Sequence, residues 1–199
     1  MIGEPNGHSW FIRAGTGDER IIHTGSNNVI MEVVKTTNKV QLKLDKSQKN
    51  QRWIIEPLRP VLPAIYVIKN VKTGTVMDLE HSTKGEGVKI FGFQPNGGAN
   101  QKWKIQAGSK APNVAICSVA TDAYAAYPTL EKGENLRSSN KSQEYIISLA
   151  DKGFHISPVQ QPEYVLDMSG AGEANETEIC LWIKHDGDHQ KWYFEAVEN

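Results

Sequence analysis

A Gln-x-Trp motif occurs three times in this chain and constrains its fold more than any other feature. The copies are Gln51-Arg52-Trp53, Gln101-Lys102-Trp103 and Gln190-Lys191-Trp192, with Gln143-Glu144-Tyr145 as a degenerate fourth. Each precedes an alternating apolar run that predicts a β-strand. Because residues i and i+2 share one face of a strand, the indole can enter a core while the amide meets backbone groups at a buried turn. The motifs recur about every 40 to 50 residues, a period that indicates repeated supersecondary units.

Four repeat-like units follow from this period, at residues 8–58, 64–107, 112–149 and 152–197. Within the units, short apolar runs separated by Gly, Asn, Asp and Thr predict strands joined by turns. The second unit is the most regular, and sustained helical periodicity is absent from the sequence. We therefore predict an all-β protein with a single domain over residues 1–199.

Four-stranded units that end in Gln-x-Trp resemble the repeats of the ricin B-chain-like lectins, whose fold is the β-trefoil. The turn Pro5-Asn6-Gly7 before an aromatic strand is most similar to the cytosolic trefoil lectins of mushrooms. A trefoil closes with three units, whereas four are counted here. Units two to four alone would make a trefoil of the usual size. Either one unit packs outside a three-unit barrel, or one is a coincidence of pattern across long loops.

Charge and cysteine content narrow the function further. A net charge of −1 and a pI near 6.6 provide no basic field for nucleic-acid binding. Cys117 and Cys180 lie in apolar strand patterns of different units, which predicts buried, reduced thiols. Because we find neither a signal peptide nor a run long enough to cross a bilayer, we expect a cytoplasmic protein without membrane insertion.

Sugar binding at a shallow site needs an acceptor for paired hydroxyls, an aromatic face for the apolar side of the ring, and a polar group that fixes orientation. In the ricin B-like pattern these are the Asp that closes the second strand, an aromatic residue on the third strand, and an amide directly before Gln-x-Trp. The resemblance implies an exposed acid, a solvent-facing aromatic ring and a supporting shell in unit two: Asp78, Phe91, Asn100, Gln101, Lys89 and Gln94.

Unit four resembles the same pattern with one departure. Asp167, Trp182 and Gln190 match the acid, the aromatic residue and the Gln, but His189 replaces the amide. An imidazole can still donate or accept a hydrogen bond, so we predict a weakened site.

Units one and three do not match the sugar-binding pattern. Unit one is predicted to contain strands at residues 10–12, 20–23 and 39–44. This alignment places His23 at the acid position and Lys43 at the aromatic position. In unit three, Tyr127 lies near the acid position and Arg137 near the aromatic position. Both units are interpreted as structural copies.

Residues 185–189 contain two His and two Asp, a composition that could hold a metal ion. We interpret the segment as a polar hairpin turn, because Asp-Gly favours a turn and the sequence shows no matching ligand cluster elsewhere. Catalytic motifs such as Gly-x-Ser-x-Gly are also missing, so we predict no enzyme activity and no cofactor.

Two function classes remain. The first is a lectin for galactose- or N-acetylgalactosamine-type glycans on glycoproteins or glycolipids, which the resemblance implies. The second is a β-trefoil protease inhibitor that acts through surface loops. The repeated set of acid, aromatic residue and amide favours the lectin, and a homodimer is left open as the oligomeric state.

Overall fold

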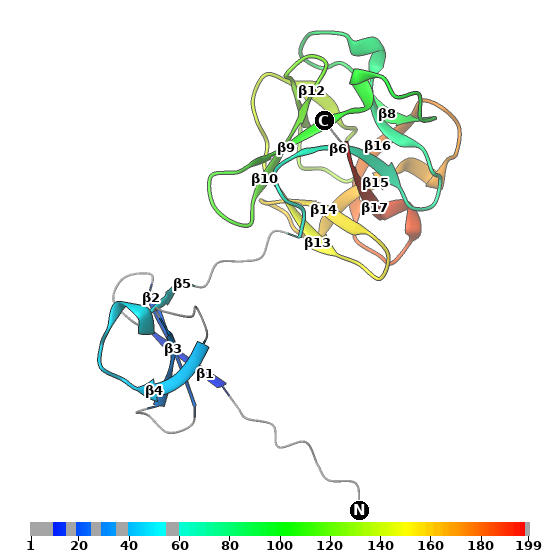
Figure 1. The fold of residues 1–199 in the computed structure, drawn as a ribbon. Coiled ribbons are helices and arrows are strands. Elements are labelled where there is room, and N and C mark those ends of the chain that lie inside the picture. The colour runs from blue at the N-terminus through cyan, green and yellow to red at the C-terminus, as the bar shows by residue number, and fades with distance from the viewer. Residues whose placement is uncertain (1–9, 15–18, 25–28, 35–39, 55–59, 198–199) are drawn as a thin grey trace, which may run out of the picture. The chain divides into compact units, whose positions relative to one another are not determined.

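The computed structural model describes residues 10–14, 19–24, 29–34, 40–54 and 60–197 (Figure 1). The chain divides into two compact parts, an N-terminal part, Met1–Glu56, and a C-terminal part, Pro57–Asn199. Every barrel strand lies in the C-terminal part, whereas the sequence analysis predicts a single domain over residues 1–199. The predicted turn Pro5-Asn6-Gly7 lies outside the described residues.

Six strands of the C-terminal part close a barrel, because each pairs antiparallel with the next and the last pairs with the first. Closure leaves these strands without a free edge, which is how all-β folds avoid edge pairing. In barrel order they are β6 (Ile65–Asn70), β9 (Trp103–Ala107), β10 (Val114–Ser118), β13 (Tyr145–Leu149), β14 (Phe154–Pro158) and β17 (Trp192–Ala196).

Each of units two to four also contributes one antiparallel hairpin. The hairpins are β7 (Val76–Leu79) with β8 (Ile90–Phe93), β11 (Tyr124–Ala126) with β12 (Arg137–Ser139), and β15 (Tyr164–Met168) with β16 (Thr177–Ile183). A six-stranded barrel with three hairpins is the β-trefoil, so the predicted fold class is confirmed.

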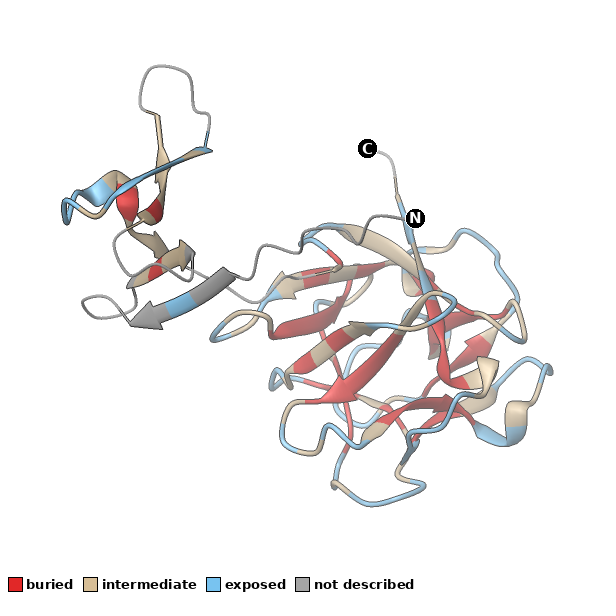
Figure 2. Ribbon diagram, turned by 90° about the horizontal axis from the view of Figure 1, so that it is seen from below, coloured by how far each residue is buried: buried red, intermediate tan, exposed pale blue. Residues whose placement is uncertain are grey.

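The core of the trefoil gathers around the aromatic residue that begins each closing strand. Trp103, Tyr145 and Trp192 are fully buried. Figure 2 shows buried residues along the strands of the C-terminal part. Each aromatic donates a hydrogen bond to a backbone carbonyl on the first hairpin strand of its own unit, so its polar atom is satisfied inside the core. The acceptors are Met77, Ala125 and Leu166, at 2.8, 2.9 and 3.0 Å.

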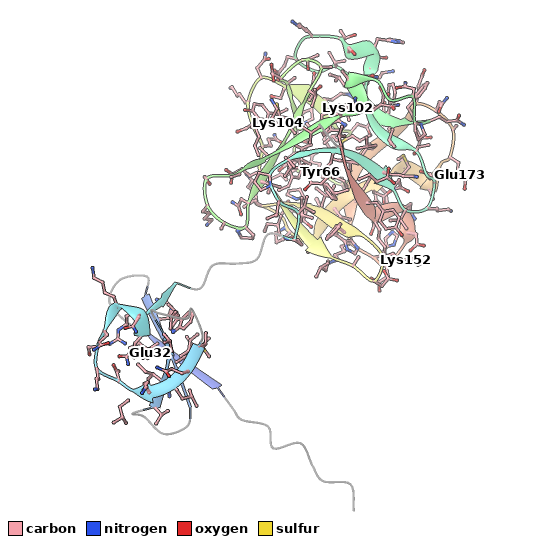
Figure 3. All side chains as sticks on the ribbon, in the orientation of Figure 1. Glu32, Tyr66, Lys102, Lys104, Lys152 and Glu173 are labelled. Atoms are coloured by element: carbon pink, nitrogen blue, oxygen red, sulfur yellow. The ribbon has the colours of Figure 1, made fainter. Side chains whose placement is uncertain are left out.

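The N-terminal part contains a separate sheet, on which Figure 3 labels Glu32. Its strands follow the order β1-β2-β3-β4, with β5 paired to β2. The elements are β1 (Trp10–Ala14), β2 (Glu19–Thr24), β3 (Val29–Val33), β4 (Val40–Leu44), the 3₁₀ turn η1 (Lys49–Gln51) and β5 (Trp53–Ile54).

Unit one repeats the hydrogen bonds of a trefoil unit around an acid, Glu32, that the sequence analysis did not predict. The Nε2 of Gln51 donates to Glu32 at 2.8 Å and to the carbonyl of Leu44 at 2.9 Å, and the Nε1 of Trp53 donates to Met31. The prediction of His23 at the acid position is wrong, because it overlooked β3 and so shifted the strand alignment.

Unit one nevertheless lacks the burial of a complete trefoil unit. Val40 and Leu42 on β4 are exposed, whereas Ile179 and Leu181, which precede Gln190 by the same intervals, are buried. Those two positions enter the core in unit four. Unit one therefore keeps the local hydrogen bonds but leaves core-type side chains in contact with solvent.

Candidate functional site

The acid of unit two is a buried carboxylate held by two amides. Asp78 closes β7, and only 3% of its surface is exposed. Asn100 donates to its Oδ1 and Gln101 to its Oδ2, each at 2.8 Å. Gln101 also donates to the carbonyl of Gln94 and accepts from the backbone of Asn96, which ties the third strand to the turn. The expectation of an exposed Asp78 is corrected, since its hairpin and these amides cover most of it.

The turn before Gln101 allows this close packing because it contains a glycine. Gly98 begins the 3₁₀ turn η3 (Ala99–Gln101). A Cβ at Gly98 would collide with the side-chain oxygens of Asn100 and Asn96. The glycine therefore lets Asn100 fold back toward Asp78.

Unit four repeats the arrangement with one amide exchanged for an imidazole. The Nε2 of Gln190 donates to Oδ2 of Asp167 at 2.8 Å and to the carbonyl of Ile183 at 3.0 Å. The Nε2 of His189 lies 3.5 Å from the same Oδ2. His185 occupies the place of Asn96, because its backbone N–H donates to Oε1 of Gln190 at 2.7 Å. The acid is thus fixed by Gln190, and His189 approaches it more loosely than Asn100 approaches Asp78.

A pocket of about 260 Å³ opens over Asp167. It brings together three residues predicted from the sequence with others that were not predicted. Trp182 is 36% exposed and provides an aromatic wall. The full lining is Asp167, Ser169, Gly170, Cys180, Trp182, His185 and His189.

The aromatic residues of the two units do not correspond as predicted. Strand register pairs Asp78 with Phe91, but Asp167 with Cys180. The counterpart of Trp182 is therefore Phe93, which lies eight residues before Gln101 as Trp182 lies eight before Gln190. Phe91 is only 4% exposed, so its predicted role as a solvent-facing platform is corrected. Phe93 is partly exposed beside it and is the better candidate for the aromatic wall.

The two rim residues of unit two keep exposed side chains. Lys89 directly precedes β8, and its backbone forms an isolated antiparallel β-bridge with Arg137. Gln94 follows β8, and its backbone N–H donates to Asn175 at 2.8 Å. Both are free to contact a ligand outside the network of Asp78.

Unit three has no acid at the equivalent position. Ala126 lies where Asp78 lies in unit two, one residue after the carbonyl that accepts from Tyr145. Instead, the side-chain amide of Gln143 accepts from the backbone N–H of Tyr127 and donates to its carbonyl, both at 2.9 Å. Arg137 forms an ion pair with Glu178 at 2.7 Å. The unit has the architecture of its neighbours without their acceptor.

Burial raises the pKa of Asp78 and of Asp167 above the ordinary value of 3.8. The hydrogen bonds from Gln101 and Asn100 oppose this rise in pKa for Asp78. For Asp167 it is opposed by the hydrogen bond from Gln190 and by electrostatic attraction to His189 and His185. Both carboxyls therefore begin to take up a proton at a higher pH than an exposed aspartate.

We expect any ligand that uses these carboxylates as acceptors to weaken on acidification at a pH above 3.8. A raised native pKa means that the folded state binds more protons, so the contribution of these two groups to the free energy of unfolding rises over the same interval. Loss of affinity should thus precede acid unfolding. Calorimetric titrations from neutral pH downward would measure it, and an affinity that stays flat down to 3.8 would contradict it.

A sequence profile of the family described as ricin-type beta-trefoil lectin domain-like matches residues 6–93 and, in a second match, residues 49–135. The chain belongs to this family of β-trefoil lectins. The recognition made from the Gln-x-Trp repeats is thereby confirmed. A search of curated proteins found no match.

Solved structures agree with this assignment. The Rhizoctonia solani agglutinin is 32% identical, with 71% of this chain and 99% of that chain covered and a TM-score of 0.68. The Macrolepiota procera ricin B-like lectin, solved with lactose, is 26% identical, with 70% and 100% covered and a TM-score of 0.62. The C-half of the earthworm R-type lectin, at 21% identity with 68% and 100% covered and a TM-score of 0.55, shares the fold.

The two cysteines and the helices complete the description. Cys117 and Cys180 are both buried and free, as predicted. Within the described ranges, we find no helix with the length and apolar character needed to cross a membrane.

Proposed function

We propose that this protein is a carbohydrate-binding lectin for galactose- or N-acetylgalactosamine-terminated glycans. It binds them without metal at shallow sites in units two and four. The observation that carries the proposal is the buried carboxylate fixed by neighbouring amides in unit two, repeated in unit four with His189. No catalytic step is proposed.

The carboxylates have acceptor capacity left for a sugar. A carboxylate offers about four lone-pair sites, and the two amides on Asp78 use one each. Pairs of sugar hydroxyls can donate to the others in charge-assisted hydrogen bonds. Phe93 in unit two and Trp182 in unit four supply the aromatic face for the apolar side of the ring. Lys89, Gln94, Asn100 and His189 surround these groups and would fix the orientation of the sugar.

The sugar class is supported by a relative. The Macrolepiota procera lectin was solved with lactose, a disaccharide that ends in galactose. Since its identity to this chain is 26%, we carry over the class of sugar and not its linkage. The natural partners would be glycoproteins or glycolipids that end in such a sugar.

Two sites on one trefoil also predict multivalent binding. A monosaccharide buries little area in a shallow site, so single-site affinities should be on the order of millimolar to tens of micromolar. Surfaces that present many glycans should be bound far more tightly through avidity.

A glycan array probed with the labelled protein tests the proposal. We expect signals confined to glycans with terminal galactose or N-acetylgalactosamine, undiminished by EDTA, and no cleavage products. A flat array would contradict carbohydrate binding. If chelation removed the signal, metal independence would be wrong.

A further inference from the structure

The pocket of unit four contains a group of side chains suited to a second kind of ligand. Asp167, His185 and His189 each offer one donor atom, and these three atoms lie within 4.8 Å of one another. The sequence alone favours a turn over a metal site at residues 185–189, because it shows no matching ligand elsewhere. The fold provides one, since it brings Asp167 at the end of β15 against the turn before Trp192.

One of the three groups is fixed and two can adjust. Asp167 is buried and held by Gln190 at 2.8 Å, so its carboxylate has a set position. His185 is exposed, and the side chain of His189 is 21% exposed. Their rings lie 5.1 Å apart between centroids, and the ring planes are tilted by 55°. A Cβ at Gly187 would collide with both rings, so the glycine makes room for the pair.

Unit two provides an internal comparison for these positions. Where unit four has His185 and His189, unit two has Asn96 and Asn100, and the backbone hydrogen bonds around them are the same. Amide side chains are poor ligands for transition metals, whereas neutral imidazoles are common ones. At both positions, therefore, unit four has a residue that commonly binds metals where unit two has one that does not.

The donor set selects a class of ion. Two imidazoles with one carboxylate suit Zn²⁺ and related divalent transition metals, whereas Ca²⁺ and Mg²⁺ prefer oxygen ligands alone. Zinc bonds to His nitrogens are about 2.0–2.1 Å long, so the imidazoles would have to move inward by rotation. His185 would exchange one weak bond, from the N–H of Gly187 to its Nδ1 at 3.2 Å, for the metal. Three protein ligands leave one position for water.

We propose that unit four binds one Zn²⁺-type ion through Asp167, His185 and His189. The ion and a sugar both require the carboxylate of Asp167, so they exclude each other at this site. This second statement rests on the proposed function, whereas the metal site itself does not. Unit two keeps its sugar site in the presence of zinc, because it has no imidazole at the matching positions.

Zinc titration of the full chain by calorimetry tests the metal site. The key variant is His185→Asn/His189→Asn, which places in unit four the residues that unit two accommodates at the same positions. We expect one zinc per chain in the unchanged protein. Affinity should fall by at least about 100-fold in the double variant, since even loss of an outer partner of a metal ligand costs roughly 10- to 100-fold. The control is His81→Asn, which changes an exposed histidine of unit two and should leave zinc affinity unchanged.

Cobalt substitution and sugar titration separate the outcomes. Co²⁺ should give tetrahedral visible absorption bands that the double variant lacks. Absence of zinc binding, or equal binding by the double variant, would overturn the metal site. If zinc leaves sugar affinity at unit four unchanged, competition is wrong. A protein that binds zinc but no sugar would overturn the proposed function and support the metal site alone.

Discussion

Trp103→Ala is expected to lower the free energy of unfolding of the trefoil by roughly 3–5 kcal/mol, as for other buried Trp truncations. The indole is fully buried at the start of β9, and it donates to the carbonyl of Met77 at 2.8 Å. Its removal leaves both a cavity and a buried carbonyl without a donor. Such a loss is a large part of the stability of a typical domain. Chemical denaturation followed by circular dichroism would measure it.

Trp182→Ala is the matched control, because it removes the same side chain from a partly exposed position. We expect it to cost much less stability than Trp103→Ala while it weakens sugar binding at unit four. Equal losses of stability in the two variants, or native stability in Trp103→Ala, would mean that the assignment of Trp103 to the core and of Trp182 to the sugar site is wrong.

Asp78→Ala should abolish sugar binding at unit two. The carboxylate is the acceptor for the sugar hydroxyls, and neither Asn100 nor Gln101 can replace its charge. Because Asp78 is buried, the variant should also lose stability, on the order of 1–3 kcal/mol for unmade hydrogen bonds. The loss should lie near the lower end, since Gln101 keeps its bond to the carbonyl of Gln94. Glycan binding and denaturation measured on the same sample separate the two effects.

Asp122→Asn is the control for charge, because asparagine tolerates the left-handed backbone of this residue (φ 61°). Its side chain is 81% exposed and forms one ion pair with Lys104 at 3.4 Å. We expect its stability and sugar affinity to stay close to those of the unchanged protein, as for ordinary surface substitutions. Undiminished sugar binding at unit two in Asp78→Ala would show that the acid is structural only.

The Gln-x-Trp repeats were enough to predict the trefoil through their resemblance to the ricin B-like lectins, because the motif marks a local arrangement. The Gln closes a turn through backbone groups within seven residues, as Gln101 does with Gln94, and the Trp enters the core two residues later. The Gln lies in a 3₁₀ turn just before the strand that the Trp begins, so both contacts belong to one short segment. The extra repeat, unit one, is also recognised from its Gln-x-Trp motif, but the separation of its strands from the barrel depends on strand pairing, which only the tertiary structure shows.

Depth and register were not readable from the pattern. Phe91 and Phe93 lie on the same face of β8, and alternation alone does not tell which of them is covered. In unit one, the acid Glu32 interrupts the apolar run Val29–Val33, so the sequence pattern does not indicate this strand and the alignment places His23 at the acid position. Counting back from each Gln would have found Phe93.

The group of Asp167, His185 and His189 shows a different limit. The acid and the turn are far apart in the sequence, and no ligand spacing links them. They meet because β15 ends beside the turn that Gln190 holds. Such a combination becomes visible only once the hairpin and the closing turn have been assembled.

Calorimetric titration of the full chain with lactose is the most direct test of the claim that units two and four bind sugar. The account predicts two sugars per chain, one in Asp78→Ala, one in Asp167→Ala, and none when both are replaced in a protein that remains folded. If lactose bound to the double variant as it does to the unchanged protein, or did not bind to the unchanged protein at all, these carboxylates would not be the centres of galactose-type sites.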